Sequence, residues 1–278
     1  MSLRRHAFKE LIKHAILWFV LVFAFFPFYL MIVISLKTND QFVSNPWWFD
    51  SVSEWHWSNW TKAWGTVQTY IANSIVTSVG AVAFCLAMSV LTSYVLARYR
   101  FPGRTIIYYA IIASMFLPGT AATLVTTFVL YMDLGLVNSL WALVIAGAVG
   151  GQVMCIFILR QFIEEIPAEL FDSAQVDGAG HLQQIRHIVL PMTGSIMGTL
   201  AILQFLGNWN NLIWPLVILR DDEKLTVPVG LMRLEGEYVK QWGELMAGYT
   251  ISSIPLVLLF LFTMRLFTRS LTAGAIKG

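Results

Sequence analysis

Long runs of apolar residues, separated by shorter polar segments, dominate the sequence. A helix that rises 1.5 Å per residue needs about 20 apolar residues to cross roughly 30 Å of hydrocarbon. Six runs reach this length, so the pattern predicts six membrane-spanning helices in one membrane domain that covers residues 1–278. The predicted spans are residues 15–36, 70–97, 105–131, 137–159, 195–219 and 245–266.

The composition agrees with a chain that is solvated by lipid. Apolar residues make up 57% of the chain, charged residues 12%, and the mean hydropathy is +0.68. Soluble domains are usually about 45–50% apolar and about 25% charged. The net charge of +2 and the lack of a basic run give no sign of a nucleic-acid partner. Cys85 and Cys155 both lie in apolar runs, so no disulfide framework is expected.

The positive charges predict the orientation. Most of the 18 lysines and arginines lie in segments on one side of the predicted spans, including both termini. Cytoplasmic loops carry such an excess, so we expect both termini in the cytoplasm. The basic N-terminus precedes the run 15–36, which is too long for a signal-peptide core and has no small-residue cleavage site after it. We therefore interpret this run as a first spanning helix.

The first outer loop, residues 37–69, is rich in tryptophan. Trp57, Trp60, Trp64 and Ile71 recur near helical spacing on one face. This pattern favours an amphipathic helix in the membrane interface, where tryptophan is enriched. Docking of an outside partner is the alternative interpretation.

The cores of the six predicted spans contain no Asp, Glu, Lys, Arg or His. Such residues mark proton or ion relays, so their absence counts against a secondary transporter. It also counts against a membrane enzyme, which needs acid–base groups or metal ligands. The prolines within the spans predict kinks or breaks in the helices. They are Pro27, Pro118, Pro215 and Pro255.

The fifth predicted span is unusually polar just before Pro215. Its candidate residues for a translocation path are Asn208, Trp209, Asn210 and Asn211. Uncharged amides and indoles suit hydrogen bonding and stacking against a neutral polyhydroxylated solute. Asparagine and glutamine, here including Gln204, also bond neighbouring helices to one another in membranes. Both interpretations stay open on the sequence alone.

The connection 161–193 is the most polar long stretch. Its segment 166–192 predicts two short helices joined by a turn, with Pro167 at the first helix start and Gly178 and Gly180 in the turn. Leu182, Ile185 and Ile188 then recur at helical spacing, and Pro191 is expected to start the next helix. This helix–turn–helix suits a groove on a cytoplasmic partner.

This loop resembles the EAA loop of the permeases of ATP-binding-cassette importers. The run Asp172-Ser173-Ala174, followed by Gly178, Ile188 and Leu190-Pro191, matches the spacing of the family, with Asp in place of Glu and Ser in place of Ala. The run Asp177-Gly178-Ala179 resembles that of sugar-importer permeases. The end of the chain, residues 271–278, resembles the tail of the maltose-type second permease. The resemblance covers about residues 70–278.

The resemblance implies an all-α integral membrane protein with six transmembrane helices. The fold would be the type I ABC importer (methionine-importer-like) permease fold with cytoplasmic EAA coupling helices. The residues that it implies in contact with an ATPase subunit are Asp172, Ser173, Ala174, Asp177, Gly178, Ala179, Leu190, Pro191, Gly274, Lys277 and Gly278. Glu235, Gly236 and Glu237 would contact a solute-binding protein. The chain has no Gly-x-x-x-x-Gly-Lys phosphate loop, so we expect no cofactor on it, and ATP and Mg²⁺ on partner subunits.

The function that this implies is that of a permease subunit, itself no enzyme, in an ATP-driven, binding-protein-dependent importer of the bacterial inner membrane. It would form half of the pore for a saccharide or saccharide derivative. The alternative solute is a phosphorylated polyol or another small molecule, and a secondary transporter is the less favoured class. The implied partners are a second permease in a heterodimer, two ATP-binding subunits, an extracytoplasmic solute-binding protein and the lipid bilayer.

Overall fold

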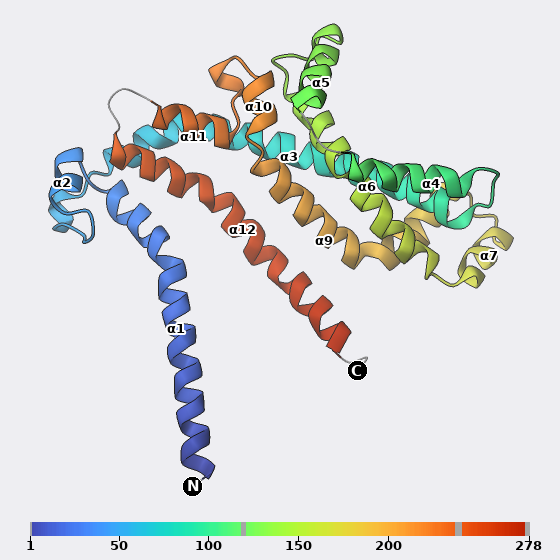
Figure 1. Cartoon of the computed structure of the whole chain (residues 1–278), viewed down its shortest axis with the longest axis horizontal. Coiled ribbons are helices and arrows are strands. Elements are labelled where there is room, and N and C mark those ends of the chain that lie inside the picture. Colours follow the sequence, from blue (N-terminus) through green and yellow to red (C-terminus); the bar gives the residue numbers. More distant parts are fainter. Residues whose placement is uncertain (1, 118–120, 237–240, 276–278) are drawn as a thin grey trace. The chain divides into compact units, whose positions relative to one another are not determined.

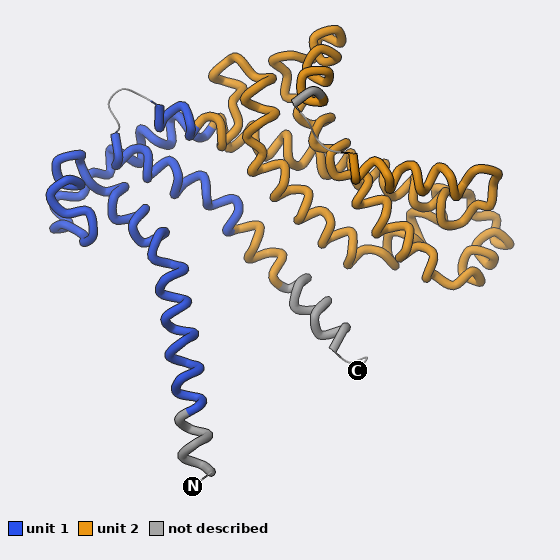
Figure 2. The backbone as a smooth tube through the Cα atoms, in the orientation of Figure 1, with its two compact units in different colours: residues 1–68, 231–257 blue, residues 69–230, 258–278 orange. Residues whose placement is uncertain are grey.

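The computed structural model describes residues 2–117, 121–236 and 241–275, and every regular element in these ranges is a helix (Figure 1). The chain divides into two compact units (Figure 2). Unit 1 comprises residues 1–68 and 231–257, and unit 2 comprises residues 69–230 and 258–278. The single domain that the sequence predicts stays a prediction.

Unit 1 contains the N-terminal helix and the aromatic segment that follows it. Its elements are α1 (Ser2–Ser35), α2 (Asn39–Ser44), η1 (Val52–Glu54), the first turns of α3 (Ser58–Arg98), the end of α11 (Val227–Glu235) and the first half of α12 (Trp242–Ala275). Thr38 caps α2, because its hydroxyl accepts the Gln41 N–H while its own N–H donates to the Gln41 side chain. The start of α12 joins the same unit through the Trp242 N–H, which donates to Asn39 Oδ1 at 3.0 Å.

Unit 2 contains the remaining helices. They are the rest of α3, α4 (Arg104–Ala113), η2 (Ser114–Phe116), α5 (Ala121–Asp133), α6 (Leu140–Glu164), α7 (Ala168–Val176), α8 (His181–Gln184), η3 (Ile185–Val189), α9 (Leu190–Trp209), α10 (Ile213–Ile218), η4 (Asp222–Lys224), the start of α11 and the end of α12. A buried apolar cluster joins α3, α6, α7, η3 and α9. Its centre includes Leu159, Phe171, Val189 and Leu200, so the predicted docking loop is built on the same core as the long helices.

Five helices of the described part are long and apolar enough to cross a membrane. They cover Lys9–Ser35, Ser58–Arg98, Leu140–Glu164, His181–Trp209 and Trp242–Met264. Each overlaps a predicted span, and α1 and α12 continue through Pro27 and Pro255 rather than breaking there. Within the described residues the chain is thus all-helical, with five candidate membrane crossings.

The expected span 105–131 is divided among α4, η2 and α5, and neither α4 nor α5 reaches the length of a spanning helix. Pro118, which lies outside the described residues, stands between them in the sequence together with Gly119. Both residue types favour the end of a helix. The count of six spans therefore stays a prediction.

Two predicted boundaries were wrong. The helix of the fifth span does not run from 195 to 219: it is continuous from His181 and ends at Trp209, and α10 begins only at Ile213. The loop predicted at 37–69 is shorter, because α3 already begins at Ser58. Trp60 and Trp64 therefore lie in the first turns of a 41-residue helix rather than in a separate interfacial one.

Candidate functional site

The predicted docking loop forms a tight elbow between α7 and α8. Gly178 has a φ of +78°, in the left-handed region that favours glycine. The Ala179 N–H donates to Ala174 O at 2.8 Å, and the Gly178 N–H donates to Gln175 O at 3.0 Å. This pair of bonds is the Schellman motif, which satisfies the last carbonyl groups of a helix. The helix and the turn expected from the sequence are therefore present.

The second half of the loop differs from the expectation. It is not a separate short helix that stops before Pro191, because α8, η3 and α9 form one continuous helix from His181 to Trp209. Residues Ile185–Val189 have π-helical bonding. A π segment is a usual way to fit an irregularity into a long helix, and here it directly precedes Leu190 and Pro191, which lacks an N–H donor. One long helix thus connects the elbow directly to the polar end of α9.

A buried glutamine fastens the elbow to α3. Gln184 is 2% exposed, and its Oε1 accepts a hydrogen bond of 2.7 Å from the hydroxyl of Tyr94 on α3. The Gln184 amide donates in turn to Ala179 O at 3.2 Å. Tyr94 is therefore linked through one side chain to the backbone of the turn. A buried amide that makes both of these bonds fixes the elbow against α3.

Further contacts at the end of α3 support the elbow. The Tyr99 hydroxyl lies 2.5 Å from His181 Nδ1, and the Arg98 guanidinium lies 3.9 Å from the centre of the buried Phe171 ring. This network was not predicted from the sequence. No sequence signal marks it, because the burial of Gln184 is visible only in the structure.

The inner side of the elbow forms an open groove of about 270 Å³. Four of the predicted contact residues line it, and they are Ala174, Asp177, Gly178 and Ala179. Asp172 and Ser173 are exposed on α7 outside the groove, and Leu190 and Pro191 are exposed at the start of α9. The exposed apolar side chains Val176 and Leu182 flank the turn. The elbow thus presents carboxylates and apolar side chains together.

The amides of the fifth span pack against glycines of α6. A methyl group built on Gly147 would lie 1.9 Å from Asn208 Oδ1, and one built on Gly151 would lie 1.9 Å from Gln204 Oε1. The two glycines and the two amides are each four residues apart, so both contacts fall on one face of each helix. Small residues allow such close helix contacts in membranes. For Asn208 and Gln204 this geometry supports the helix-packing interpretation.

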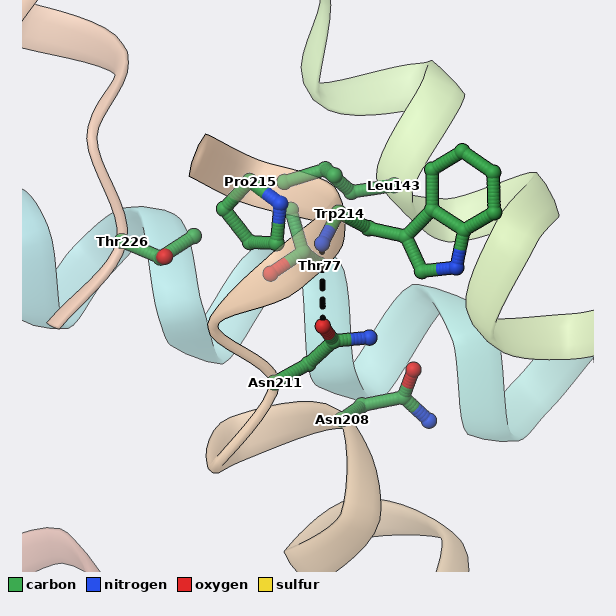
Figure 3. A pocket seen from close by; sticks show the side chains of 7 residues that line it. All are labelled: Thr77, Leu143, Asn208, Asn211, Trp214, Pro215 and Thr226. Carbon is green, nitrogen blue, oxygen red and sulfur yellow. Dashed lines mark hydrogen bonds between the residues drawn. The ribbon is translucent and has the colours of Figure 1, made fainter. Parts of the chain in front are cut away.

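The end of α9 is also the site of a small cavity with polar and apolar walls (Figure 3). Its volume is about 10 Å³, and its walls are Thr77, Leu143, Asn208, Asn211, Trp214, Pro215 and Thr226. The Asn211 Oδ1 accepts the Trp214 N–H at 3.2 Å and so starts α10 after the break (Figure 3). Trp209 is only 2% exposed and stacks on Phe205, whereas Asn210 is exposed. The four predicted path residues are therefore adjacent in the chain but differ in their surroundings.

Asn138 clamps the segment that follows α10. Its φ is +60°, and its Oδ1 accepts the N–H groups of Arg220 at 3.1 Å and Asp221 at 3.2 Å. Its Nδ2 donates to Asp221 Oδ2 at 2.6 Å. This hydrogen bond, followed by that from Lys224, holds the pKa of the exposed Asp221 carboxyl below its usual range. One side chain therefore connects the α5–α6 turn to the loop that leads to α11.

Replacing Asn138 separates the role of its backbone from that of its amide. We expect Asn138→Ala to destabilise the protein more than Asn138→Gly, by about 1 kcal/mol, because only alanine is strained at a positive φ. The midpoint of thermal unfolding in detergent measures the stability of both variants. The variant Asn138→Gly should be less stable than wild type, and this difference in stability should become smaller as pH falls through the lowered pKa of Asp221. Protonation removes the charge that the Asn138 amide stabilises. Equal stability of the two variants would contradict the proposed backbone strain.

The other predicted contact residues belong to other elements than the elbow. Glu235 ends α11 in unit 1, and the Gly236 N–H donates to Met232 O and Arg233 O at 3.1 and 3.0 Å. Gly274 lies near the end of α12. Glu237, Lys277 and Gly278 lie outside the described residues.

Comparison with known proteins identifies the class. Residues 89–273, which include the elbow, the break and the end of α12, match the family described as "Binding-protein-dependent transport system inner membrane component". The chain belongs to this family of inner-membrane transport components. It is therefore a multi-pass protein of the inner membrane and a transport component rather than an enzyme in itself.

Individual relatives agree with this membership. The chain is 35% identical to the arabinooligosaccharides transport system permease protein AraQ of Halalkalibacterium halodurans, over 77% of this chain and 76% of that one. It is 33% identical to the diacetylchitobiose uptake system permease protein DasC of Streptomyces coelicolor, over 91% and 92%. Its fold is similar, with a TM-score of 0.80 and 20% identity over 94% and 97%, to a chain in the crystal structure of a bacterial ABC transporter involved in the import of the acidic polysaccharide alginate.

Proposed function

We propose that the chain is a permease subunit of an ATP-driven, binding-protein-dependent importer and forms half of a pore for a saccharide or saccharide derivative. The observation that carries this proposal is the family match over residues 89–273, which contains both the elbow and the polar end of α9. The names of the relatives AraQ and DasC, both permeases for oligosaccharides, support the solute class.

We propose that the elbow is the contact with an ATPase subunit. Asp172, Ser173 and Asp177 would present carboxylates and a hydroxyl to basic side chains of that partner, and the turn at Gly178 would fit its groove. Leu190 and Pro191 lie on the continuous helix His181–Trp209, which would carry movement of the elbow toward the membrane. Gly274, Lys277 and Gly278 would reach the same subunits. ATP and Mg²⁺ are then bound by the two ATPase subunits and not by this chain.

The translocation path is proposed to pass the break between α9 and α10. The exposed amide of Asn210 and the half-buried amide of Asn211 are available to solute hydroxyl groups. Asn208 and Trp209, which contact Gly147 and Phe205, would support these two residues from behind. Interrupted helices of this kind expose polar backbone only where it lines a cavity or is covered by protein.

The topology that we propose has six spans, with α4, η2 and α5 together making the third crossing and both termini in the cytoplasm. The segment Glu235, Gly236 and Glu237 would then face outward and contact a solute-binding protein. A second, different permease chain would complete the pore. The distribution of lysine and arginine supports this orientation.

Reconstitution tests the proposal. The chain, a second permease, the ATPase subunits and the solute-binding protein of the same system are placed in liposomes. The solute is the oligosaccharide that most raises the thermal stability of the binding protein. We expect uptake that requires ATP inside the liposomes and the binding protein outside. Uptake driven by an ion gradient without ATP would overturn the mechanism, and ATP-dependent uptake of a polyol phosphate alone would overturn the solute class.

A further inference from the structure

The segment between α1 and α3 in unit 1, residues 45–57, is held in a fixed shape by buried polar contacts. Lys37 is 2% exposed, and its ammonium group pairs with Asp50 Oδ2 at 2.6 Å. Trp55 Nε1 donates to Asp50 O at 3.0 Å. The Asn45 amide donates to Asp50 Oδ1 at 3.3 Å. An ion pair withdrawn from water and joined by further hydrogen bonds fixes the loop around Asp50.

This fixed segment presents large apolar side chains outward. Trp47 is 54% exposed, Trp48 70% and Val52 70%, and Phe49 and Trp57 are also exposed. The rings form a series in which Phe49 contacts Trp55 and Trp55 contacts Trp57, at centroid distances of 5.7 and 6.0 Å. A cluster of exposed aromatic rings on a rigid loop indicates a surface that meets something other than water.

The cluster does not extend away from α1 but folds back along it. The Trp47 ring stacks on the Phe26 ring at 6.3 Å and 17°, and the Tyr29 hydroxyl donates to Trp47 O at 3.0 Å. Phe26 and Tyr29 lie nine and six residues before the end of α1 at Ser35. At 1.5 Å per residue, Trp47 therefore lies about 9–14 Å back from that end, measured along the helix.

That position corresponds to the outer part of the hydrocarbon layer. The candidate span in α1, Lys9–Ser35, has 27 residues. It is therefore about 40 Å long, which equals a bilayer with its headgroup regions. With about 5 Å of headgroup region at each end, a point 9–14 Å inside one end lies about 4–9 Å below the headgroups. A tryptophan there can keep its apolar ring among the acyl chains while neighbouring polar groups stay near the interface, where tryptophan and tyrosine are enriched.

We propose that residues 45–57 form an aromatic anchor that lies in the lipid interface beside α1, with Trp47 and Trp48 embedded among the lipids. The continuity with the exposed apolar surface of α1 favours lipid over a protein partner: Phe23 and Phe25, which lie on nearly opposite faces of the same stretch of helix, are 74% and 62% exposed. The anchor fixes the depth of the end of α1 in the membrane. The ion pair of Lys37 and Asp50 gives the loop the rigidity that this role needs.

Spin-label accessibility tests the anchor in the complete importer, reconstituted in liposomes. The two cysteines of the chain, Cys85 and Cys155, are first replaced by alanine, and a label is then attached at Trp48→Cys. We expect collisions with oxygen to exceed those with a water-soluble nickel complex, and a depth between those of two reference labels. The references are Phe23→Cys on α1 and Glu223→Cys in the exposed η4.

A second measurement needs no label and leaves the native cysteines in place. Lipids brominated near the headgroup should quench tryptophan fluorescence of the wild-type complex, and the variant Trp47→Phe/Trp48→Phe should lose part of that quenching. A label at position 48 that behaves like the one at position 223 overturns the proposal. So does a label that is protected only after the solute-binding protein is added, since the surface would then be a docking site. Unchanged quenching in the double variant also counts against it.

Discussion

Gly178→Val is expected to lower ATP-dependent uptake by at least tenfold while the protein still inserts into the membrane. Gly178 has a φ of +78°, and nothing lies within 4 Å of the position of an added Cβ. The cost of a larger residue is therefore conformational and not steric. A left-handed conformation costs an ordinary residue about 1–2 kcal/mol, and a β-branched one more. Since 1.4 kcal/mol corresponds to a factor of ten, the strain would shift the equilibrium away from the present shape of the elbow by about tenfold or more.

The matched control is Gly180→Ala, two residues further along the same turn. Gly180 has an ordinary φ of −70°, and an added Cβ would meet only the end of the Gln183 side chain at 3.9 Å. We expect near-normal uptake from this variant. Uptake and ATP hydrolysis are measured together in proteoliposomes, where Gly178→Val should hydrolyse ATP without transport. Full uptake by Gly178→Val would contradict the role of the elbow in coupling.

The elbow was the part of the site that the sequence predicted best. Pro167 and Gly178 have strong local preferences, so a helix start and a turn follow from the residue types alone. The contacts beneath the turn were not predictable in the same way. Gln184 meets Tyr94 across 90 positions of sequence, and no local pattern encodes which buried tyrosine an amide will reach. Tertiary packing decides this, and periodicity does not report it.

The rough positions of the spans were predicted better than the extent of their helices. A count of apolar residues detects the 15 or 20 residues that can face lipid. It does not detect polar residues that continue the same helix beyond the apolar run. α3 continues back to Ser58 and the helix of α9 continues back to His181, because polar residues such as Asn59 and Gln183 are compatible with helix. Pro215 predicted a kink or break in the fifth span, and α9 does end at Trp209, a few residues earlier. The position of the break did not follow from the pattern, since residues Leu212–Leu219 around Pro215 are apolar.

The amides of the fifth span show a further limit of prediction from residue type. Asparagine and glutamine serve a solute path and a helix contact equally well, so their type alone did not distinguish the two. The distinguishing information lay on α6. Gly147 and Gly151 face Asn208 and Gln204, whereas Gly150, one residue before Gly151, faces open space. Two glycines of α6 therefore allow a close helix contact and a third does not, and only the packing reveals which.

Gly147→Ala is accordingly expected to destabilise the protein by about 1–3 kcal/mol, the usual cost of an overpacked contact. The new methyl group would lie 1.9 Å from Asn208 Oδ1 and 2.9 Å from the Cβ of Ala81 on α3. The Asn208 amide can rotate away, but the Ala81 Cβ moves only with the backbone, and Ala81 is fully buried. α6 and α3 must therefore separate. The midpoint of thermal unfolding in detergent, compared with wild type, measures the loss.

The control Gly150→Ala adds the same methyl group to the same helix, with nothing within 4 Å. It should be neutral or stabilising by about 0.5–1 kcal/mol, since alanine favours helix over glycine. Asn208→Ala, combined with Gly147→Ala, removes the clash with the amide but not the one with Ala81, so we expect only partial recovery. Full recovery would mean that Asn208 alone opposes the methyl group. Equal unfolding midpoints for Gly147→Ala and Gly150→Ala would show that α3, α6 and α9 do not meet at Gly147, and Asn208 would then be free to face the solute path.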